Sequence, residues 1–408
     1  MRLKDVAILN PKYDGEDLDN ELVSFSPMEC LRYDNLRPYT IPFKDARGKY
    51  TYFANNDVLF AKVTPCFENL NTAIASNLLN GIGFGSSEIN VLRFSDKCYT
   101  RYFFYLICSR QFIDKGCASM SGVGGLKRVN PLAVTTFEFE LPPRLEQEAI
   151  ADYLDKECDK ITREINLLER KVDCYSRLRR SLINRIVTQG LNQMAPLKLS
   201  GLPWIEFIPE HWNIKRGKSI LKEVYRNVRP EDRIVTCFRD GEVTLRVNRR
   251  TTGFTESEKE IGYHGVRVGD LVVHQMDAFA GAIGISDSDG KCSPICIVCR
   301  PLNEDETDIR YYCQLLRVMA YSGFIQSLAK GIRERTTDFR YKTLEILHLP
   351  VPPYVEQQQI VTYLDEKCSR IDSIIEKIKL KIERLKELKR SLINEVVTGQ
   401  RTIKTSDL

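Results

Sequence analysis

The chain has 408 residues, of which 43% are hydrophobic and 28% charged, and 60 Lys and Arg against 55 Asp and Glu give a formal net charge of +5. This composition is typical of a soluble globular protein, and the length predicts two or three domains. No apolar run approaches the ~20 residues that span a bilayer. The N-terminal stretch has no signal-peptide core. We therefore expect a cytoplasmic protein with no membrane association.

The first predicted domain covers residues 1–143. It consists mostly of short β-branched or aromatic runs separated by Gly, Asn and Asp, a pattern that predicts short strands and turns. The stretch "RYFFYLICS" from Arg101 predicts a short helix. We therefore expect a mixed α+β domain.

A long helix is predicted next, over residues 144–190, and its opening phrase returns later in the chain. "LPPRLEQEAIADYLDKECDK" from Leu141 is answered by "VPPYVEQQQIVTYLDEKCSR" from Val351. The fifty residues from Leu141 align without a gap on the fifty from Val351, and about 20 of these positions are identical. Similarity that keeps one register for this long indicates a duplication. A second long helix is therefore predicted over 351–400, followed by a tail at 401–408.

Both predicted helices carry the same apolar stripe, with spacings that alternate mainly between four and three, as in a coiled coil. Each helix should be roughly 40 residues and ~60 Å long. The first stripe holds Ile150, Leu154, Cys158, Ile161, Ile165, Leu168, Val172, Tyr175, Leu178 and Leu182. The second holds Ile360, Leu364, Cys368, Ile371, Ile375, Ile378, Ile382, Leu385, Leu388 and Leu392.

The matching stripes predict that the two helices pack on each other instead of lying in separate cores. The first helix ends where the second globular segment begins, and the second helix begins where that segment ends. Antiparallel packing brings these two points together, so we expect antiparallel helices. The residues predicted to pair the helices are Ile161, Ile165, Leu168, Val172, Ile371, Ile375, Ile378 and Ile382.

The second globular segment, residues 191–350, resembles the first weakly. "RLKDVAILN" from Arg2 aligns with "ILKEVYRNV" from Ile220, and the residues around Asp57 align with those around Asp270. "RYYCQLLRV" from Arg310 predicts a helix that matches the one from Arg101. The predicted fold is therefore α+β, with two pseudo-symmetric globular domains joined by two long antiparallel coiled-coil helices.

Thirteen cysteines fit a reducing compartment if they are reduced. Cys296 and Cys299 form a C-x-x-C pair with Cys292 nearby, a spacing that can hold zinc. No adjacent histidine or second pair completes a four-ligand set, and the surrounding residues predict a buried strand. We therefore interpret these thiols as small buried side chains and expect no metal.

Catalysis by this chain is not supported by its motifs. "NPKY" at Asn10 differs from the Asn-Pro-Pro-Tyr loop of adenine methyltransferases at its third residue, and a turn after the first strand explains it as well. "GIGFGSS" at Gly81 lacks the strand and helix that flank a nucleotide-binding loop. Asp270 lies near His274, but the matching Asp57 has no histidine, so both aspartates are predicted to be turn residues.

The whole chain resembles the specificity (S) subunits of type I DNA restriction–modification systems. The resemblance rests on "LPP…EQ…I…YLD" at the start of each repeat, on "SLINRIVTQG" near its end, and on "SGLPWIEFIPEHWNIKRG" from Ser200. The first domain departs from the pattern because it starts directly at the "LKDV" element. Either a short leader or the C-terminal tail is expected to complete it.

This resemblance implies a non-catalytic reader of double-stranded DNA. Each globular domain would be a target recognition domain for one half of a bipartite site. The paired helices would set the spacer between the halves and dock methyltransferase (M) subunits, which use S-adenosylmethionine. Restriction (R) subunits would join for cleavage, and the chain itself would need no cofactor.

Glycine- and arginine-rich loops are the predicted DNA contacts, because Gly lets a backbone approach a duplex and Lys or Arg reach phosphates and guanines. Residues 215–250 also hold eleven Lys or Arg against five Asp or Glu. The candidates are Lys127, Arg128, Lys330, Arg333 and Arg335, then Arg246, Arg249 and Arg250, and lastly Lys44, Arg47 and Lys49. The alternative is a non-enzymatic coiled-coil scaffold with two peptide-binding domains, which explains the helices but not these loops.

Overall fold

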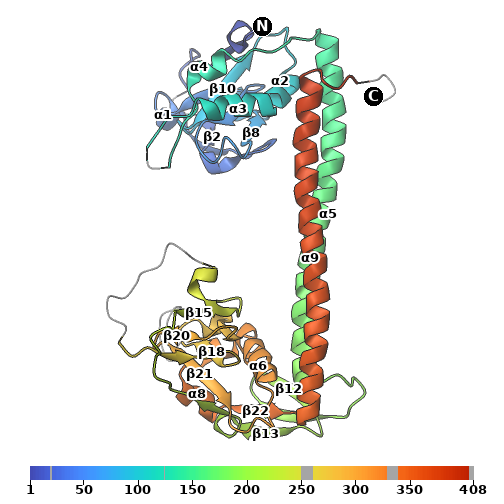
Figure 1. The fold of residues 1–408 in the computed structure, drawn as a ribbon. Coiled ribbons are helices and arrows are strands. Elements are labelled where there is room, and N and C mark those ends of the chain that lie inside the picture. The colour runs from blue at the N-terminus through green and yellow to red at the C-terminus, as the bar shows by residue number, and fades with distance from the viewer. Residues whose placement is uncertain (19–20, 124, 250–260, 329–338, 404–408) are drawn as a thin grey trace. The chain divides into compact units, whose positions relative to one another are not determined.

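The structure is a computed structural model and describes residues 1–18, 21–123, 125–249, 261–328 and 339–403. The chain forms two compact units, each with strands and helices (Figure 1): unit 1 comprises Met1–Arg170 and Ile378–Leu408, and unit 2 comprises Lys171–Lys377. The predicted α+β class is confirmed. Within the described residues, no helix is both long and apolar enough to cross a bilayer.

Unit 1 is built on two four-stranded sheets. The antiparallel sheet has the order β1 (Ala7–Leu9), β10 (Ile89–Phe94), β7 (Val58–Ala61), β8 (Thr72–Ile74). The mixed sheet has the order β5 (Tyr39–Pro42), β2 (Leu22–Ser26), β9 (Ile82–Gly85), β6 (Thr51–Ala54), with β2 and β9 parallel. The remaining elements are the hairpin β3 (Leu31–Arg32) and β4 (Asn35–Leu36), and helices α1 (Phe43–Ala46), α2 (Thr100–Ile107), α3 (Arg110–Ala118) and α4 (Pro131–Thr135).

Unit 2 has one four-stranded sheet of the same kind, ordered β14 (Leu221–Glu223), β21 (Cys296–Pro301), β18 (Leu271–His274), β19 (Ile283–Ile285). Helix α6 (Ile309–Tyr321) packs against this sheet (Figure 1). The other strands pair as β11 (Leu197–Leu202) with β12 (Ile205–Pro209), β13 (Asn213–Arg216) with β22 (His348–Val351), β15 (Val235–Cys237) with β16 (Val243–Leu245), and β17 (His264–Val266) with β20 (Gly290–Cys292). Short helices α7 (Phe324–Ser327) and α8 (Tyr341–Ile346) complete the unit.

Strand register corrects the predicted alignment of the two units. Ala7 pairs with Phe94 at the end of β10, and Leu221 pairs with Pro301 at the end of β21. Ala7, not Leu3, is therefore the counterpart of Leu221. The short letter match around "LKDV" misled the alignment because four residues cannot fix a register, whereas the ladder of hydrogen bonds does.

The two units differ in the segment that leads into the Pro pair. In unit 2 this segment contains strand β22, which pairs with β13 over four residues. In unit 1 the corresponding segment makes only an isolated bridge, between Arg2 and Glu138. One bridging pair is too short to be a strand.

Helices α5 (Arg144–Gln189) and α9 (Tyr354–Val397) are the two long elements, and they pack antiparallel, as predicted. In unit 1 the Lys381 ammonium lies 2.7 Å from the Glu164 carboxylate. In unit 2 the Arg179 guanidinium lies 2.9 Å from Asp372. The residues of α9 that were predicted to pair the helices are 6–9% exposed: Ile371, Ile375, Ile378 and Ile382. Those predicted on α5 are half-buried: Ile161, Ile165, Leu168 and Val172.

Two members of the predicted stripe do not belong to it. Leu178 and Leu388 occupy equivalent positions in the repeat and are 53% and 55% exposed. Continuing the heptad from Ile382 through Leu385 leads to Lys389 and not to Leu388, and the same step on α5 leads to Arg179. The predicted stripe was wrong at this position because it was assigned by hydrophobicity, whereas the helix–helix contact holds Lys389 on α9 and Arg179 on α5 there.

A buried glutamine at the start of each long helix explains the "EQ" of the repeated phrase. Gln357 accepts from the Asp308 amide at 2.9 Å and donates to the carbonyls of Pro352 and Glu306. Gln147 accepts from the Tyr99 amide at 2.8 Å and donates to the Pro142 carbonyl. Each glutamine thus ties the Pro-pair turn to the start of α6 or α2.

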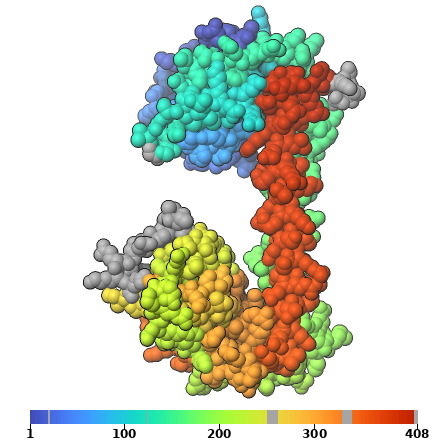
Figure 2. All heavy atoms as spheres, in the orientation of Figure 1, coloured from blue at the N-terminus to red at the C-terminus, as the bar shows by residue number. Residues whose placement is uncertain are grey.

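A buried tyrosine in each unit holds the end of the other long helix. Tyr311 on α6 donates to the Val187 carbonyl at 2.9 Å, and Tyr102 on α2 lies 3.4 Å from the Val397 carbonyl. Val187 and Val397 are equivalent in the repeat. The space-filling view shows the globular part of unit 1 packed directly on this end of α9 (Figure 2). Each unit therefore contacts the start of one long helix through its glutamine and the end of the other through its tyrosine.

Candidate nucleic-acid interface

The loop between α3 and α4 is the first predicted DNA contact, and the structure shows how it is shaped. Gly125 has a φ of +82°, and a Cβ on Gly122 would lie 2.2 Å from the Leu126 carbonyl oxygen. Thr64 pins the loop, because its hydroxyl accepts from the Lys127 amide at 3.0 Å and its amide donates to the Lys127 carbonyl at 3.0 Å. The backbone of Lys127 is thus fixed while its side chain is exposed.

Arg128, beside it, is not an unoccupied cation. Its guanidinium makes two hydrogen bonds of 2.8 Å to the two carboxylate oxygens of Glu88. These bonds lower the pKa of Glu88. Arg128 would have to share or leave this carboxylate before it could contact DNA.

The residues that follow the two corresponding loops are held in the same way. The Val129 amide donates to the Lys62 carbonyl at 2.8 Å, and the Phe339 amide donates to the Gln275 carbonyl at 3.2 Å. The two loops therefore leave equivalent points of the two units, as predicted. The candidates Lys330, Arg333 and Arg335 lie outside the described residues.

The third candidate segment follows β16. Arg249 lies 2.7 Å from Asp240 and 3.0 Å from Glu242, and its guanidinium lies over the ring of Phe238 at 4.3 Å. Arg246 is half-buried, with its Nε 3.5 Å from Thr236 Oγ1. Arg250 lies outside the described residues. Of this group, Arg249 is held by two carboxylates.

The fourth candidate segment, residues 44–49, follows a strand of unit 1, as the third follows a strand of unit 2. Tyr39 pairs with Phe25 at the start of β5, and in unit 2 the Arg246 amide donates to the Ile234 carbonyl at the matching place. Each segment follows the strand that pairs with β2 or β15. Lys44 and Lys49 are exposed, whereas Arg47 lies 3.0 Å from Asp17.

The basic run of residues 215–250 is in part an ionic framework. Of the ten Lys and Arg that the structure describes there, five lie within ion-pair distance of a carboxylate. These pairs are Lys215–Glu306, Arg226–Asp270, Arg229–Asp289, Arg239–Asp277 and Arg249 with Asp240 and Glu242.

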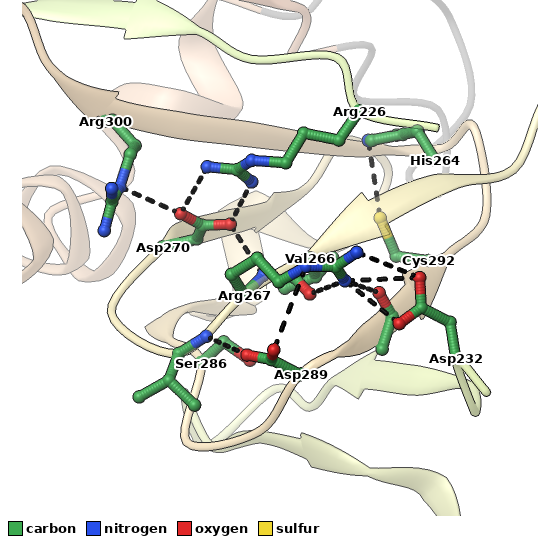
Figure 3. Close-up of polar contacts among 12 residues, drawn as sticks. Arg226, Asp232, His264, Val266, Arg267, Asp270, Ser286, Asp289, Cys292 and Arg300 are labelled. Carbon is green, nitrogen blue, oxygen red and sulfur yellow. Dashed lines mark hydrogen bonds and ion pairs between the residues drawn. The ribbon is translucent and has the colours of Figure 1, made fainter. Parts of the chain in front are cut away.

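Unit 2 also contains a buried ion-pair network (Figure 3), whose pairing was not predicted. Asp270 is fully buried, accepts from the Arg267 amide at 2.8 Å, and lies 2.5 Å from Arg226 and 3.1 Å from Arg300. The Arg267 side chain lies 3.0 Å from the buried Asp232. Aspartate as a turn residue was correctly predicted, but the arginines were hidden because they are remote in sequence.

Unit 1 repeats the central pair of this network. Asp57 accepts from the Ala54 amide at 2.7 Å and receives two hydrogen bonds from Arg93, of 2.9 and 2.7 Å. This carboxylate raises the pKa of Arg93. Arg93 and Arg300 occupy the same place on β10 and β21, so the Asp–Arg pair is common to both units.

The clustered thiols of unit 2 and the nearby His264 are buried inside the domain. Cys292, Cys296 and Cys299 are buried, and Cys292 Sγ lies 3.4 Å from His264 Nε2. Hydrogen bonding to Cys296 and burial raise the pKa of the Cys292 thiol, and burial lowers the pKa of His264. Across the described part of the chain, no group of three or more His, Cys, Asp or Glu is placed to hold a metal ion.

The methyltransferase-like "NPKY" is a turn after β1, as predicted. Asn10 has a φ of +51°, accepts from the Val91 amide at 2.9 Å and donates to Asn90 at 3.2 Å. Its amide group is thus occupied by the fold. The glycines from Gly81 lead into strand β9 and form no nucleotide-binding loop.

Comparison with known proteins shows which family the first part of the chain resembles. Residues 1–170 match the family model described as "Type I restriction modification DNA specificity domain". The chain is 40% identical over 149 residues to the type I restriction enzyme EcoAI specificity subunit of Escherichia coli, covering 36% of this chain and 25% of that relative. Over this part of its sequence the chain is similar to type I restriction–modification specificity subunits.

Two solved structures share the fold of the chain over nearly its whole length. A structure from work on complex assembly and conformational transition of the type I R-M system has a TM-score of 0.72 at 16% identity, covering 98% of this chain and 97% of that one. The HsdS subunit from Thermoanaerobacter tengcongensis has a TM-score of 0.54 at 16% identity, covering 98% and 96%. The chain spans only about a quarter of the length of the EcoAI and EcoEI specificity subunits that it matches.

Proposed function

We propose that this chain is the non-catalytic DNA-reading subunit of a type I restriction–modification complex. Each unit reads one half of a bipartite duplex site. The paired helices set the spacer and bind the methyltransferase subunits, which carry S-adenosylmethionine, and the restriction subunits join this assembly. Because the assembly would act on DNA, the chain would be in the cytoplasm.

The proposal rests on one observation: the two units share the same structural elements but carry different side chains at an equivalent place. Both units share the Asp–Arg pair, the buried glutamine and the loop anchor, yet Tyr39 stands in one unit where Arg246 stands in the other. Two different readers on equivalent frames suit an asymmetric split site, whereas two identical readers would require a palindrome.

The deciding experiment maps methylated adenines in DNA exposed to the assembled complex. The expected result is two short half-sites separated by a fixed spacer. Exchanging the globular part of unit 1 for that of a related subunit should change one half-site and leave the other unchanged. A single continuous site, or a change in both halves, would overturn the proposal.

The competing function is a protein scaffold with two peptide-binding domains. Binding of the assembled complex to random duplex DNA at low and moderate salt separates the two. A DNA reader loses affinity steeply as salt rises because phosphate contacts release counterions, and a scaffold shows no such dependence.

A further inference from the structure

An exposed aromatic patch lies on the mixed sheet of unit 1, outside the loop around Lys127. It is formed by Tyr39 at the start of β5 and Tyr50 just before β6, which are 52% and 43% exposed. Both rings contact Phe25 edge-on, with centroids 5.4 and 4.7 Å from it. Phe25 itself is buried and holds the two tyrosines in place. We call Tyr39 and Tyr50 the tyrosine pair.

The tyrosine pair lies in a cationic segment. Residues 37–50 contain four cations and one acid: Arg37, Lys44, Arg47 and Lys49 against Asp45. Arg37, Lys44 and Lys49 are exposed, and their side chains form no hydrogen bond or ion pair with any part of the chain that the structure describes. Cations without carboxylate partners remain available to an anionic ligand, unlike Arg128 and Arg249.

Exposed aromatic rings among free cations fit duplex DNA in particular. Lys and Arg bind phosphates and fix orientation, while base edges are read in the major groove. An apolar ring face matches the C5-methyl group of thymine, which other bases lack there. A tyrosine held by a buried phenylalanine loses little conformational entropy on binding.

We propose that the tyrosine pair is a specificity determinant of unit 1 and contacts a thymine methyl group in its half-site, with Lys44 and Lys49 on flanking phosphates. This inference rests on the proposed DNA-reading function and deepens it. The Arg246 counterpart in unit 2 gives the two units different chemistry at one place, because arginine is the commonest reader of guanine.

The test uses the assembled complex and a duplex carrying its mapped site, with each thymine of the unit 1 half-site replaced in turn by uracil, which lacks only the methyl group. For the unchanged protein, one uracil position should weaken binding by about two- to tenfold, the effect of losing one buried methyl group. In the Tyr39→Ala/Tyr50→Ala variant, the same uracil should have no further effect, because the contact is already gone. Tyr39→Phe and Tyr50→Phe should keep the methyl sensitivity.

Matched controls come from the same unit. Ile8→Ala removes another exposed apolar side chain, and Lys97→Ala removes another exposed lysine. Both should leave affinity and site preference unchanged, whereas Lys44→Ala and Lys49→Ala should each reduce the salt slope by about one. Thermal unfolding shows whether the tyrosine variants are folded.

Two results would overturn the inference. One is full affinity and unaltered half-site preference in the folded double tyrosine variant. The other is a uracil effect that persists undiminished in that variant, since the methyl group would then be read elsewhere. Either can occur while methylation mapping still returns a bipartite site, so failure here is distinct from failure of the proposed function.

Discussion

The Lys389 ammonium on α9 donates a 2.9 Å hydrogen bond to Thr162 Oγ1 on α5 and lies 4.3 Å from the ring centre of Tyr33. The equivalent residues of the repeat, Arg179 and Asp372, form the 2.9 Å ion pair of unit 2. The seam therefore carries one polar pair at the same heptad position in each unit. A polar pair in an apolar seam fixes register, because a shifted helix would leave it without its partner.

The first prediction ranks three seam substitutions. Thr162→Val keeps the volume and removes the hydrogen bond, so it should cost about 1 kcal/mol of unfolding free energy. Asp372→Ala breaks an exposed pair and should cost only about 0.2–1 kcal/mol. Ile375→Ala removes buried apolar volume and should cost about 2–5 kcal/mol. Urea unfolding of the three variants gives the order, and a larger effect for Asp372→Ala than for Ile375→Ala would contradict the packing described.

The second prediction concerns the buried Gln357, which ties the Pro-pair turn to the start of α6 and which we call the clamp. Gln357→Ala leaves the Asp308 amide and two carbonyls without partners, and each should cost about 1–3 kcal/mol. Gln357→Glu should also destabilise, because a carboxylate cannot donate to the Pro352 and Glu306 carbonyls. Thermal unfolding and hydrogen exchange at the start of α6 measure this. The exposed neighbour Gln358 provides the control, and equal melting of Gln357→Ala and Gln358→Ala would show that the clamp is unimportant.

The third prediction addresses the Asp–Arg pairs. Asp270→Asn leaves Arg226 and Arg300 without their buried counter-charge and should destabilise unit 2 by about 3–5 kcal/mol. Asp240→Asn, in the exposed pair with Arg249, should cost no more than about 1 kcal/mol. Unfolding free energies of the two variants test the contrast. Similar values would mean that the network contributes no more than a surface pair.

The fourth prediction is a pH dependence. Burial lowers the pKa of His264 and of His274 in the folded protein. The unfolded chain therefore binds more protons below about pH 6.5, so stability should fall as pH decreases through that value. His264→Phe should reduce the slope, and His348→Gln, at an exposed position, should not. Melting temperatures between pH 5.5 and 7.5 provide the measurement, and an unchanged slope in His264→Phe would refute this assignment.

The fifth prediction tests the proposal that the length of the paired helices sets the spacer between the half-sites. Inserting four residues into each long helix, after Leu168 in α5 and at the facing turn of α9, adds about one turn or ~6 Å and keeps the stripe nearly in phase. The preferred spacer should lengthen by about one or two base pairs at ~3.4 Å each, with both half-sites unchanged. Methylation mapping gives the spacer directly. A well-folded insertion with the original spacer would show that the helices do not set it.

The repeat, the two long helices and their antiparallel packing were all predictable from the sequence. These follow from local periodicity and from the chain path, and both are legible in one dimension. The sequence also placed turns correctly at Asn10, Asp57 and Asp270. Its errors came where hydrophobicity or a few letters stood in for geometry, as at Leu388 and in the alignment of Leu3 with Leu221.

Which charged side chains are available to a ligand could be seen only in the folded chain. Arg128, Arg249 and Arg226 look alike in the sequence to Lys44 and Lys49, but the first three are held by carboxylates that lie far away along the chain or around a turn. Ion pairs depend on distance in space, and side-chain identity carries no record of it. For the same reason the tyrosine pair emerged only from the fold, since two tyrosines eleven residues apart meet on Phe25 when β5, β2 and the start of β6 are brought together.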